Sequence, residues 1–239
     1  MVVKQVQSAS RVLATFEALA EHQPAGVSAL ARALGDDKSA VQRALLTLAE
    51  AGWIARTGPE LGQWKLTSRV AAFAAVAEQR VNLRAIARPV LEQLRDELGE
   101  TMLLCVLRDR RVLTIDVVES NQLVRTAPTV GLEIPLEGSA ASQAILAHLR
   151  AADLTRVLGE APSRTLLSHL GRARRRGWAV NNRRVRAGAS AVGAAILDRR
   201  GRPLASIALS GPATRLPPAV LAAHGPRVAA AAARIAAMV

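Results

Sequence analysis

The sequence has a single cysteine, Cys105, among its 239 residues. A lone cysteine excludes a disulfide bond within the chain. The four histidines, His22, His148, His169 and His224, lie far apart and show none of the spacings of a metal-binding motif. We therefore predict no metal site and no cofactor, and the cysteine usage is typical of a reducing compartment.

Long hydrophobic runs are also missing. No stretch of about 18 uncharged apolar residues, the length that spans a membrane, occurs in the chain. The N-terminal segment carries charges inside its apolar pattern and is therefore not interpreted as a signal peptide. We expect a cytoplasmic protein without a membrane partner.

Lysine is scarce, since only three of the 32 basic residues are lysines, and with 19 acidic residues the net charge is +13. Residues 1–80 contribute nine basic and seven acidic residues, or +2, which leaves +11 for residues 81–239. A strongly positive chain favours a polyanionic partner such as nucleic acid. The arginine excess is equally consistent with a compositional bias, so it carries little weight in the prediction.

Apolar residues, by contrast, are plentiful. Half of the residues are hydrophobic and 21% are charged, which is enough apolar surface for a sizeable core and unlike the composition of disordered chains. Domains usually have about 100–150 residues. A chain of this length is therefore expected to form two domains.

The first third of the chain has the pattern of short helices. Apolar side chains recur at helical spacing between Ser8 and Glu21, with Ser8 or Ser10 as the expected N-cap. A second helix is predicted to begin at Ser28, as its N-cap, and to end at Gly35. Both helices are expected to pack their apolar sides inward.

A third helix is predicted from about Lys38 to Ala51, and the period then changes from helical to extended. The segments 53–56 and 63–66, joined by a loop over 57–62, predict a two-stranded hairpin. Three short helices followed by a hairpin are typical of a winged helix-turn-helix.

In such a domain the third helix enters the DNA major groove and the hairpin touches the flanking backbone. The candidate DNA-binding side chains are Lys38, Ser39, Gln42, Arg43, Arg56 and Lys65. Arg43 and Gln42 match guanine and adenine edges, respectively. Lys38 and Ser39 at the helix start suit phosphate, and the two hairpin residues suit the DNA backbone. Two alternatives stay open: an ordinary solvated surface, or a winged helix that docks a protein rather than DNA.

The remaining two thirds predict a linker helix and an α+β domain. The apolar stripe of the linker helix, residues 68–80, either packs on its own domain or joins two subunits; it consists of Val70, Phe73, Ala74 and Ala77. Further helices are predicted at 83–98, 140–150, 152–158, 164–175 and 218–237, and strands at 101–107, 112–118, 189–197 and 203–209.

Catalysis is not predicted, and no catalytic residue is assigned. Ser139, Ser142 and Ser190 are expected in loops of small residues, and the segment 188–193 has a spacing one residue too long for a nucleophile elbow. No histidine has a sequence context that would place it as a base. A hydrolase built on Ser190 is the enzymatic alternative.

Several strings, taken in order, resemble the IclR-type bacterial transcriptional regulators. The string SAVQRALLTL at 39–48 resembles the recognition helix of that family. Other matching strings are found at 91–94, 98–101, 134–136, 176–180 and 210–212. Each string is short, but together they cover almost the whole chain.

This resemblance implies a sequence-specific transcriptional regulator in three parts. Residues 1–67 would form the winged helix-turn-helix, residues 68–81 the linker helix, and residues 82–239 a GAF-like domain for effector binding and oligomerisation. The implied partners are a double-stranded DNA operator, a small-molecule effector and further copies of the chain, as a homodimer or a dimer of dimers. The sign of regulation does not follow from the sequence.

The resemblance also implies an effector site. Its residues would be Leu123, Thr126, Ile134, Ala140, Ala141, Asn181, Ala189, Ala191, Ala208 and Ser210. Ala140 and Ala141 would lie at a helix start, where backbone N–H groups favour a carboxylate.

The chain departs from the usual family pattern in its polar residues. Ser142 and Gln143 stand where many relatives have Gly-Lys, Asn181 where some carry an acid, and Ala191 where some carry a cysteine. A site with so few polar groups favours an aromatic acid over a very small keto acid such as glyoxylate. The alternative is that the alanines reflect composition and that the pocket is small or vestigial.

Overall fold

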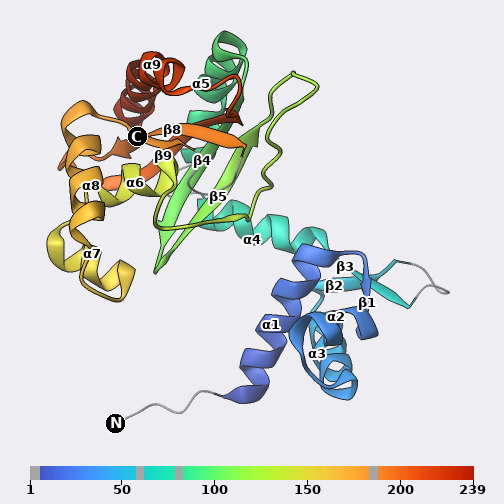
Figure 1. Ribbon diagram of the computed structural model, residues 1–239. Helices are drawn as coiled ribbons and strands as arrows, with labels where there is room; N and C mark the ends of the chain where they lie inside the picture. Colours follow the sequence, from blue (N-terminus) through green and yellow to red (C-terminus); the bar gives the residue numbers. More distant parts are fainter. Residues whose placement is uncertain (1–5, 58–61, 79–82, 183–187) are drawn as a thin grey trace. The chain divides into compact units, whose positions relative to one another are not determined.

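The computed structural model describes residues 6–57, 62–78, 83–182 and 188–239, with the side chains of 74–78 and 182 outside the description. The chain divides into two compact units, residues 1–80 and 81–239 (Figure 1). None of the helices in the described part is long and apolar enough to cross a membrane.

The first unit is a three-helix domain with a small sheet. In chain order its elements are α1 (Gln7–His22), β1 (Ala25–Gly26), α2 (Val27–Leu34), α3 (Lys38–Glu50), β2 (Ile54–Arg56), β3 (Gln63–Leu66) and α4 (Ser68–Glu78). The sheet order is β1-β3-β2, and both pairings are antiparallel. Leu19, Leu30 and Leu45, one from each of the first three helices, are fully buried in a common core. This arrangement is a winged helix-turn-helix.

Two predicted helix starts are wrong. α1 begins at Gln7 after Val6, so neither Ser8 nor Ser10 is its N-cap. α2 begins at Val27, with Gly26 rather than Ser28 as its N-cap residue. For α2 the reason is that residues 25–26 form the strand β1, which pairs with β3, and the helix begins at the next residue. A two-residue strand has no period that a sequence pattern could reveal.

The second unit is an α+β domain built on one sheet. Its elements are α5 (Leu83–Leu98), β4 (Thr101–Arg108), β5 (Arg111–Val118), β6 (Glu133–Ile134), α6 (Ala140–Leu146), α7 (Ala151–Leu158), α8 (Arg164–Arg176), β7 (Ala179–Asn182), β8 (Ala189–Leu197), β9 (Pro203–Pro212) and α9 (Pro218–Ala237). The six strands have the order β6-β5-β4-β9-β8-β7, and every neighbouring pair is antiparallel. The predicted α+β class is confirmed.

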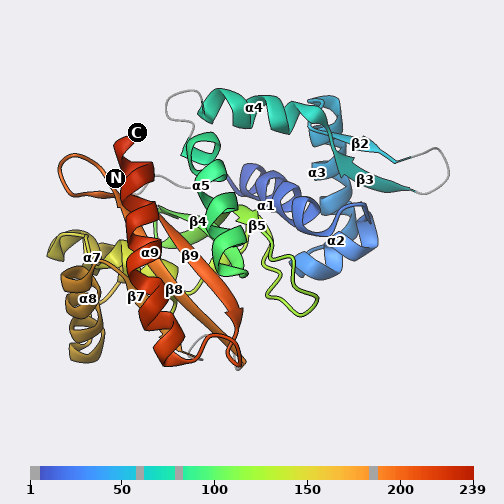
Figure 2. The same cartoon turned by 90° about the horizontal axis from the view of Figure 1, so that it is seen from above.

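Helices cover both faces of this sheet. α5 and α9 lie side by side on one face, where they share a core with β4, β8 and β9 (Figures 1 and 2). α6 lies on the other face against β8 and β9, and α7 and α8 pack beyond it. The sheet is therefore the middle layer, and the space beside α6 is bounded by strand faces and loops.

Several predictions for this unit need correction. Strands β6 and β7 were not predicted, because each has four residues or fewer, which is too short for a period of two to be recognised. The predicted helix over 140–150 ends at Leu146, so His148 lies after it rather than on it. Of the expected loop serines, Ser139 is the N-cap of α6, Ser142 lies inside α6, and Ser190 lies in β8; all three are buried.

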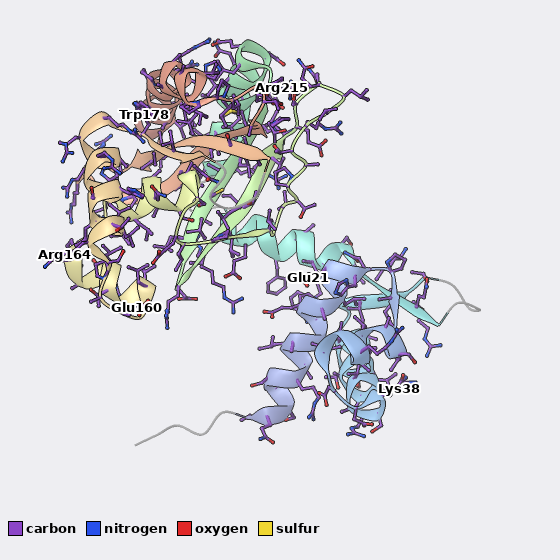
Figure 3. All side chains as sticks on the ribbon, viewed as in Figure 1. Glu21, Lys38, Glu160, Arg164, Trp178 and Arg215 are labelled. Carbon is purple, nitrogen blue, oxygen red and sulfur yellow. The ribbon has the colours of Figure 1, made fainter. Side chains whose placement is uncertain are left out.

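The packing of α9 gives a prediction about stability. A Cβ atom at Gly225 would stand 2.3 Å from two ring atoms of Trp178, a residue labelled in Figure 3. We expect Gly225→Ala to lower the free energy of unfolding by about 1–3 kcal/mol, because overpacking outweighs the better helix propensity of alanine. Gly171→Ala in α8 is the matched control, since its Cβ atom would lie 3.6 Å from the nearest neighbour, Arg175 Nη1.

Gly171→Ala should raise stability by up to about 1 kcal/mol through helix propensity alone. Urea denaturation of the two variants followed by circular dichroism measures both effects. If both variants changed the free energy of unfolding in the same direction, the close contact between Gly225 and the Trp178 ring would be contradicted.

Candidate nucleic-acid interface and ligand cavity

The third helix of the first unit presents a polar face to solvent. Lys38, Ser39 and Arg43 are exposed and Gln42 is half-buried, whereas Val41 and Leu45 are buried in the core. Lys38 is seen at the beginning of α3 in Figure 3. The side chains predicted to meet DNA therefore lie on the accessible side of α3.

The start of α3 is closed by Asp37. Its carboxylate accepts hydrogen bonds from the backbone N–H of Ala40, at 3.1 Å, and from the hydroxyl of Ser39. The hydrogen bond from Ser39, followed by that from Ala40, holds the pKa of Asp37 below its ordinary value. The hydrogen of the Ser39 hydroxyl is thus donated within the chain and is not available to a phosphate in this arrangement. The phosphate contact of Ser39 stays a prediction. Arg43 is exposed, and one of the five N–H groups of its guanidinium, on Nη1, donates to Ser39 Oγ at 3.3 Å.

The predicted hairpin is present as β2 and β3, while residues 58–61 of its loop lie outside the described residues. Arg56 and Lys65 are both exposed on it. The Arg56 guanidinium lies 5.0 Å from the ring centroid of Trp64, a cation–π contact that restrains the side chain. Both side chains are therefore accessible on the wing, and their contact with the DNA backbone stays a prediction.

The beginning of the linker helix is fastened to the winged helix. Phe73 of α4 packs on Trp53 with ring centroids 4.8 Å apart, and Arg69 stacks over Trp53 at 4.9 Å while donating to the carbonyl of Ala51. Phe73 is nevertheless 56% exposed. The side chains of Ala74 and Ala77, also assigned to the apolar stripe, lie outside the described residues.

The second unit contains a cavity of about 660 Å³ beside the start of α6, which we refer to as the effector cavity. Nine of the ten residues predicted for the effector site line it. They are Thr126, Ile134, Ala140, Ala141, Asn181, Ala189, Ala191, Ala208 and Ser210. The sequence positions span 85 residues, and the fold brings them around one hollow.

Strand register explains how these residues meet. Asn181 pairs with Ala191, and Ala191 pairs with Ser210, so the three residues form a row across β7, β8 and β9. Ala189 and Ala208 lie two residues from members of this row along their strands, and period two places them on the same face. The small side chains leave the space that the cavity occupies.

Leu123 is the exception among the predicted residues. Its side chain is 95% exposed and does not line the cavity, whereas the next residue, Val124, does. The segment after β5 has no strand pairing at this point, so the side chain that faces inward cannot be inferred from alternation. The placement of Leu123 in the pocket wall is wrong.

Thr126 has a structural as well as a lining position. Its hydroxyl donates to the carbonyl of Ser210 at 2.9 Å, and its carbonyl accepts from the hydroxyl of Thr101 at 2.8 Å. These two bonds tie the loop wall of the cavity to the ends of β9 and β4. The hydroxyl of Thr126 is therefore occupied within the chain.

Two charged lining residues were not predicted, Arg125 and Glu133. Arg125 is the one cation among the described residues that line the cavity, and it pairs with Glu119, whose Oε2 lies 2.9 Å from Arg125 Nε. Glu133 pairs with Arg111 at 3.4 Å. Arg125 directly precedes Thr126, which was predicted for the site. This adjacency in the sequence is the signal that could have identified Arg125. A guanidinium at the cavity wall suits a carboxylate.

No three His, Cys, Asp or Glu side chains in the described ranges lie together so as to hold a metal ion. The polar chemistry of the cavity is therefore that of one arginine, one glutamate, serine, threonine and asparagine side chains, and backbone groups. Such a lining fits a small organic molecule that is mostly apolar.

Comparison with known proteins agrees with this architecture. The family model of the bacterial transcriptional regulator IclR C-terminal domain matches residues 75–237, and that of the IclR helix-turn-helix domain matches residues 8–58. The chain is 31% identical over 226 residues to the transcriptional repressor IclR of Escherichia coli, covering 89% of this chain and 82% of that protein. It is 29% identical over 238 residues to the HTH-type transcriptional regulator BhcR of Paracoccus denitrificans, covering 95% and 85%, respectively.

Solved structures with low sequence identity share the fold. An IclR homologue from Microbacterium hydrocarbonoxydans, crystallised with 4-hydroxybenzoate, has a TM-score of 0.81 at 21% identity and covers 97% of this chain and 98% of its own. An IclR-type regulator from Alicyclobacillus acidocaldarius also has a TM-score of 0.81, at 22% identity, with 98% and 99% coverage. These relatives are regulators, and none of the matched families is an enzyme family.

Proposed function

The chain belongs to the IclR family of bacterial transcriptional regulators, and on that basis we propose that an aromatic or similarly apolar carboxylic acid binds in the effector cavity and alters DNA binding. As a member of the family it is a DNA-binding regulator with a helix-turn-helix domain and a C-terminal effector domain. The proposal concerns the chemistry of its effector and the residues that meet effector and DNA.

The effector cavity carries the proposal. Its volume of about 660 Å³ lies in the range of small-molecule sites, about 300–1,000 Å³, and far exceeds what a two-carbon keto acid fills. The lining is dominated by alanine, proline and branched apolar side chains, which suits a ring. The structure of the homologue with 4-hydroxybenzoate makes that acid the first ligand to test.

Arg125 is the side chain that we assign to the effector carboxylate. Its guanidinium carries five N–H donors; Nε and Nη2 contact Glu119, and Nη1 makes a long hydrogen bond of 3.5 Å to the carbonyl of Gln122, which leaves two N–H groups for a ligand. The start of α6, with Ala140 and Ala141 in the lining, faces the same cavity and adds backbone donors. A bound acid would thus be oriented with its apolar body toward the alanines of β8 and β9.

The proposed DNA contacts are those of α3 and the wing, with Arg43 and Gln42 at base edges and Lys38, Arg56 and Lys65 at phosphates. The assembly we propose is a homodimer, or a dimer of dimers, on an operator with two-fold symmetry. The effector changes the occupancy of the operator by the protein only if it binds two arrangements of the assembly with different affinities.

We assign no catalytic step to the chain. Ser190 is buried in β8 and lies in no exposed turn. Burial raises the pKa of the Cys105 thiol to about 12, so a thiolate nucleophile is not available at that position. The alternative of a winged helix that docks protein predicts DNA affinity that does not fall with salt, whereas phosphate contacts make the logarithm of affinity fall linearly with the logarithm of salt concentration.

The test uses DNA selected from a random pool by the full-length protein. Fluorescence anisotropy measures affinity for this DNA at two salt concentrations, with and without 4-hydroxybenzoate, and calorimetry measures binding of the acid. We expect the acid to bind and to change the DNA affinity. Glyoxylate binding in place of the aromatic acid would contradict the proposed effector class, and salt-insensitive or absent DNA binding would favour the protein-docking alternative.

A substitution inside the cavity sharpens this test. Ala191→Phe places a ring in the cavity and should weaken binding of the acid more than about a hundredfold, while binding of the selected DNA without effector is retained. Leu123→Ala is the control, because its exposed side chain lies outside the lining. Equal loss of acid binding in both variants would show that the effector binds elsewhere.

A further inference from the structure

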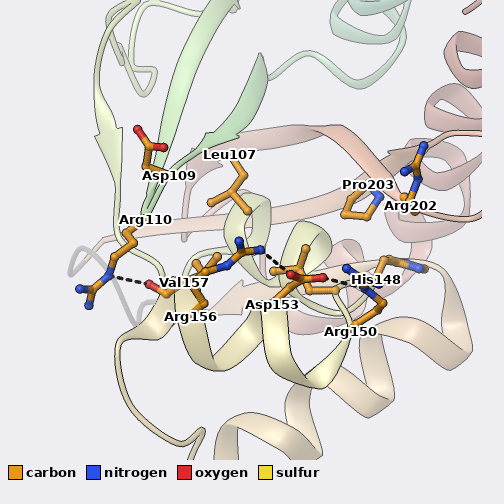
Figure 4. Close-up of a pocket in the computed structure, with 11 residues that line it drawn as sticks. Leu107, Asp109, Arg110, His148, Arg150, Asp153, Arg156, Val157, Arg202 and Pro203 are labelled. Carbon is orange, nitrogen blue, oxygen red and sulfur yellow. Dashed lines mark hydrogen bonds and ion pairs between the residues drawn. The ribbon is translucent and has the colours of Figure 1, made fainter. Parts of the chain in front are cut away.

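A second cavity, of about 590 Å³, lies in the same unit at the opposite end of the central strands (Figure 4). The effector cavity involves Leu103 of β4 and the start of α6, whereas the second cavity involves Leu107 of β4 and His148, just after α6 ends. No lining residue is common to the two cavities. We call this second hollow the arginine cavity.

Four arginines from three separate segments line the arginine cavity. Arg110 lies in the turn between β4 and β5, Arg150 precedes α7, Arg156 lies within α7, and Arg202 precedes β9. These positions are up to 92 residues apart, so the convergence is produced by the fold and not by a local run of arginine.

Each guanidinium is held by contacts within the chain. Arg110 donates to the carbonyls of Val157, at 3.1 Å, and Leu158, at 2.9 Å, which are the last carbonyls of α7. Arg150 and Arg156 share the carboxylate of Asp153, as Figure 4 shows. Arg202 Nε lies 2.7 Å from Asp198 Oδ2.

These contacts leave donors for a ligand. A guanidinium has five N–H groups, and the contacts of these four arginines with described residues use one or two each. The Arg150, Arg156 and Arg202 side chains are 88%, 75% and 69% exposed, so their free donors are accessible to an anion from solvent.

The surrounding charge is strongly positive. The turn at 108–111, the turn at 198–202 and the segment 150–156 together hold eight arginines and three aspartates, or +5. Glu133, which pairs with Arg111, reduces this sum to +4. A large part of the +11 of residues 81–239 is therefore gathered at this end of the sheet. The excess of arginine over acidic residues, to which the composition alone assigned no role, is thus concentrated around this cavity.

The floor of the arginine cavity is apolar, with Leu107, Leu149, Val157 and Pro203 in its lining. His148 is half-buried beside them, and burial, followed by the positive charge of Arg174, lowers the pKa of its imidazole. A neutral imidazole can accept a hydrogen bond as well as donate one. The hollow thus combines cationic walls with a surface for a carbon skeleton.

We propose that the arginine cavity is a second ligand site, which binds a small organic molecule carrying a phosphate or several carboxylates. Several converging guanidiniums match a ligand with at least two negative charges, and their planar forks match phosphate and carboxylate oxygens. The volume and the apolar floor favour a small molecule over the backbone of a duplex. This site is independent of the effector proposed for the other cavity.

The test measures binding of radiolabelled pyrophosphate to the full-length protein by equilibrium dialysis at fixed ionic strength. We expect saturable binding that unlabelled fructose 1,6-bisphosphate displaces and that acetate does not. Displacement by citrate as well assigns the site to multiply charged anions in general, and failure of citrate to displace assigns it to phosphates. 4-Hydroxybenzoate should leave the binding unchanged, because it occupies the other cavity.

A pair of double variants identifies the site. Arg150→Gln with Arg156→Gln should weaken pyrophosphate binding about ten- to a hundredfold, because hydrogen bonds to charged groups are lost. Arg172→Gln with Arg175→Gln, two exposed arginines on α8, removes the same charge from the same unit and should leave binding unchanged. Arg202→Gln serves as an independent third variant if the first double variant is less stable.

Three results would overturn the proposal. They are absence of pyrophosphate binding at millimolar concentration, an equal loss in both double variants, which indicates diffuse charge, and displacement of the label by DNA of unrelated sequence. In the last case the surface is a contact for the DNA backbone and not a small-molecule site. Failure of the effector proposal would leave all of these measurements interpretable, because none of them uses the effector cavity.

Discussion

Replacement of Arg43 by alanine is expected to weaken binding to the selected operator by about 1–3 kcal/mol for each subunit and to relax base preference at one position of each half-site. Arg43 lies on the exposed face of α3, and its guanidinium is restrained only by a hydrogen bond of 3.3 Å to Ser39 among the described residues. A bidentate contact with a guanine edge would use the donors that this bond leaves.

Arg32→Ala is the matched control for this variant. Arg32 is exposed on α2 in the same unit, so its loss removes the same charge without touching the outer face of α3. Anisotropy with the selected DNA and with single-base variants of it measures both affinity and preference. If Arg32→Ala and Arg43→Ala lose the same affinity and neither changes base preference, Arg43 acts through charge alone and reads no base.

The second large effect concerns the ion pair between Glu100 and Arg215 in the effector domain. Both oxygens of Glu100 accept from Arg215, with distances of 2.5 Å to Nε and 2.8 Å to Nη2, and the Glu100 side chain is 5% exposed. The hydrogen bond to Glu100 raises the pKa of Arg215 above its ordinary value. Gly211 lies so close that an added Cβ atom would overlap the carboxylate.

Arg215→Met should lower the free energy of unfolding by about 3 kcal/mol, because it leaves a buried carboxylate without its partner. Arg215 also donates to the carbonyl of Val124, at 2.9 Å, in the loop that lines the effector cavity (Figure 3 labels Arg215). Weaker binding of 4-hydroxybenzoate is therefore expected in the same variant.

Arg227→Met provides the comparison for this loss of stability. Arg227 pairs with Glu97, but more than a third of each side chain is exposed, and such pairs contribute less than about 1 kcal/mol. Urea denaturation of the two variants measures the difference. Equal destabilisation would mean that burial of Glu100 does not govern the strength of its ion pair.

Local pattern determined most of the helices and the long strands. The helix at 218–237 and the strand at 189–197 have the predicted bounds, and the hairpin of β4 and β5 differs by one residue at two ends. Periods of 3.6 and 2 are properties of a short segment, so they can be recognised without knowledge of the fold. The short strands β1, β6 and β7 were missed, because two to four residues are too few to show a period of 2.

The lining of the effector cavity was predicted in part from the sequence and decided in part by the tertiary structure. Resemblance to the family identified nine of its lining residues, yet it missed Arg125 and included Leu123, which points to solvent. In a loop without strand pairing, a small change of backbone direction decides which of two neighbouring side chains faces the cavity and which faces solvent. The packing of the loop on Thr101 and Ser210 decides which of them faces the cavity.

The sequence by itself determined the class of the domains, the exposed face of α3 and the family, since these depend on local periodicity and on short ordered strings. Only the tertiary structure decided where the charge gathers. Arg110, Arg202 and the pair Arg150 and Arg156 lie in three different segments, and antiparallel pairing of β4 with β9 and the position of α7 bring them together. Electrostatic attraction depends on distance in space, so composition revealed the amount of charge but not the site it forms.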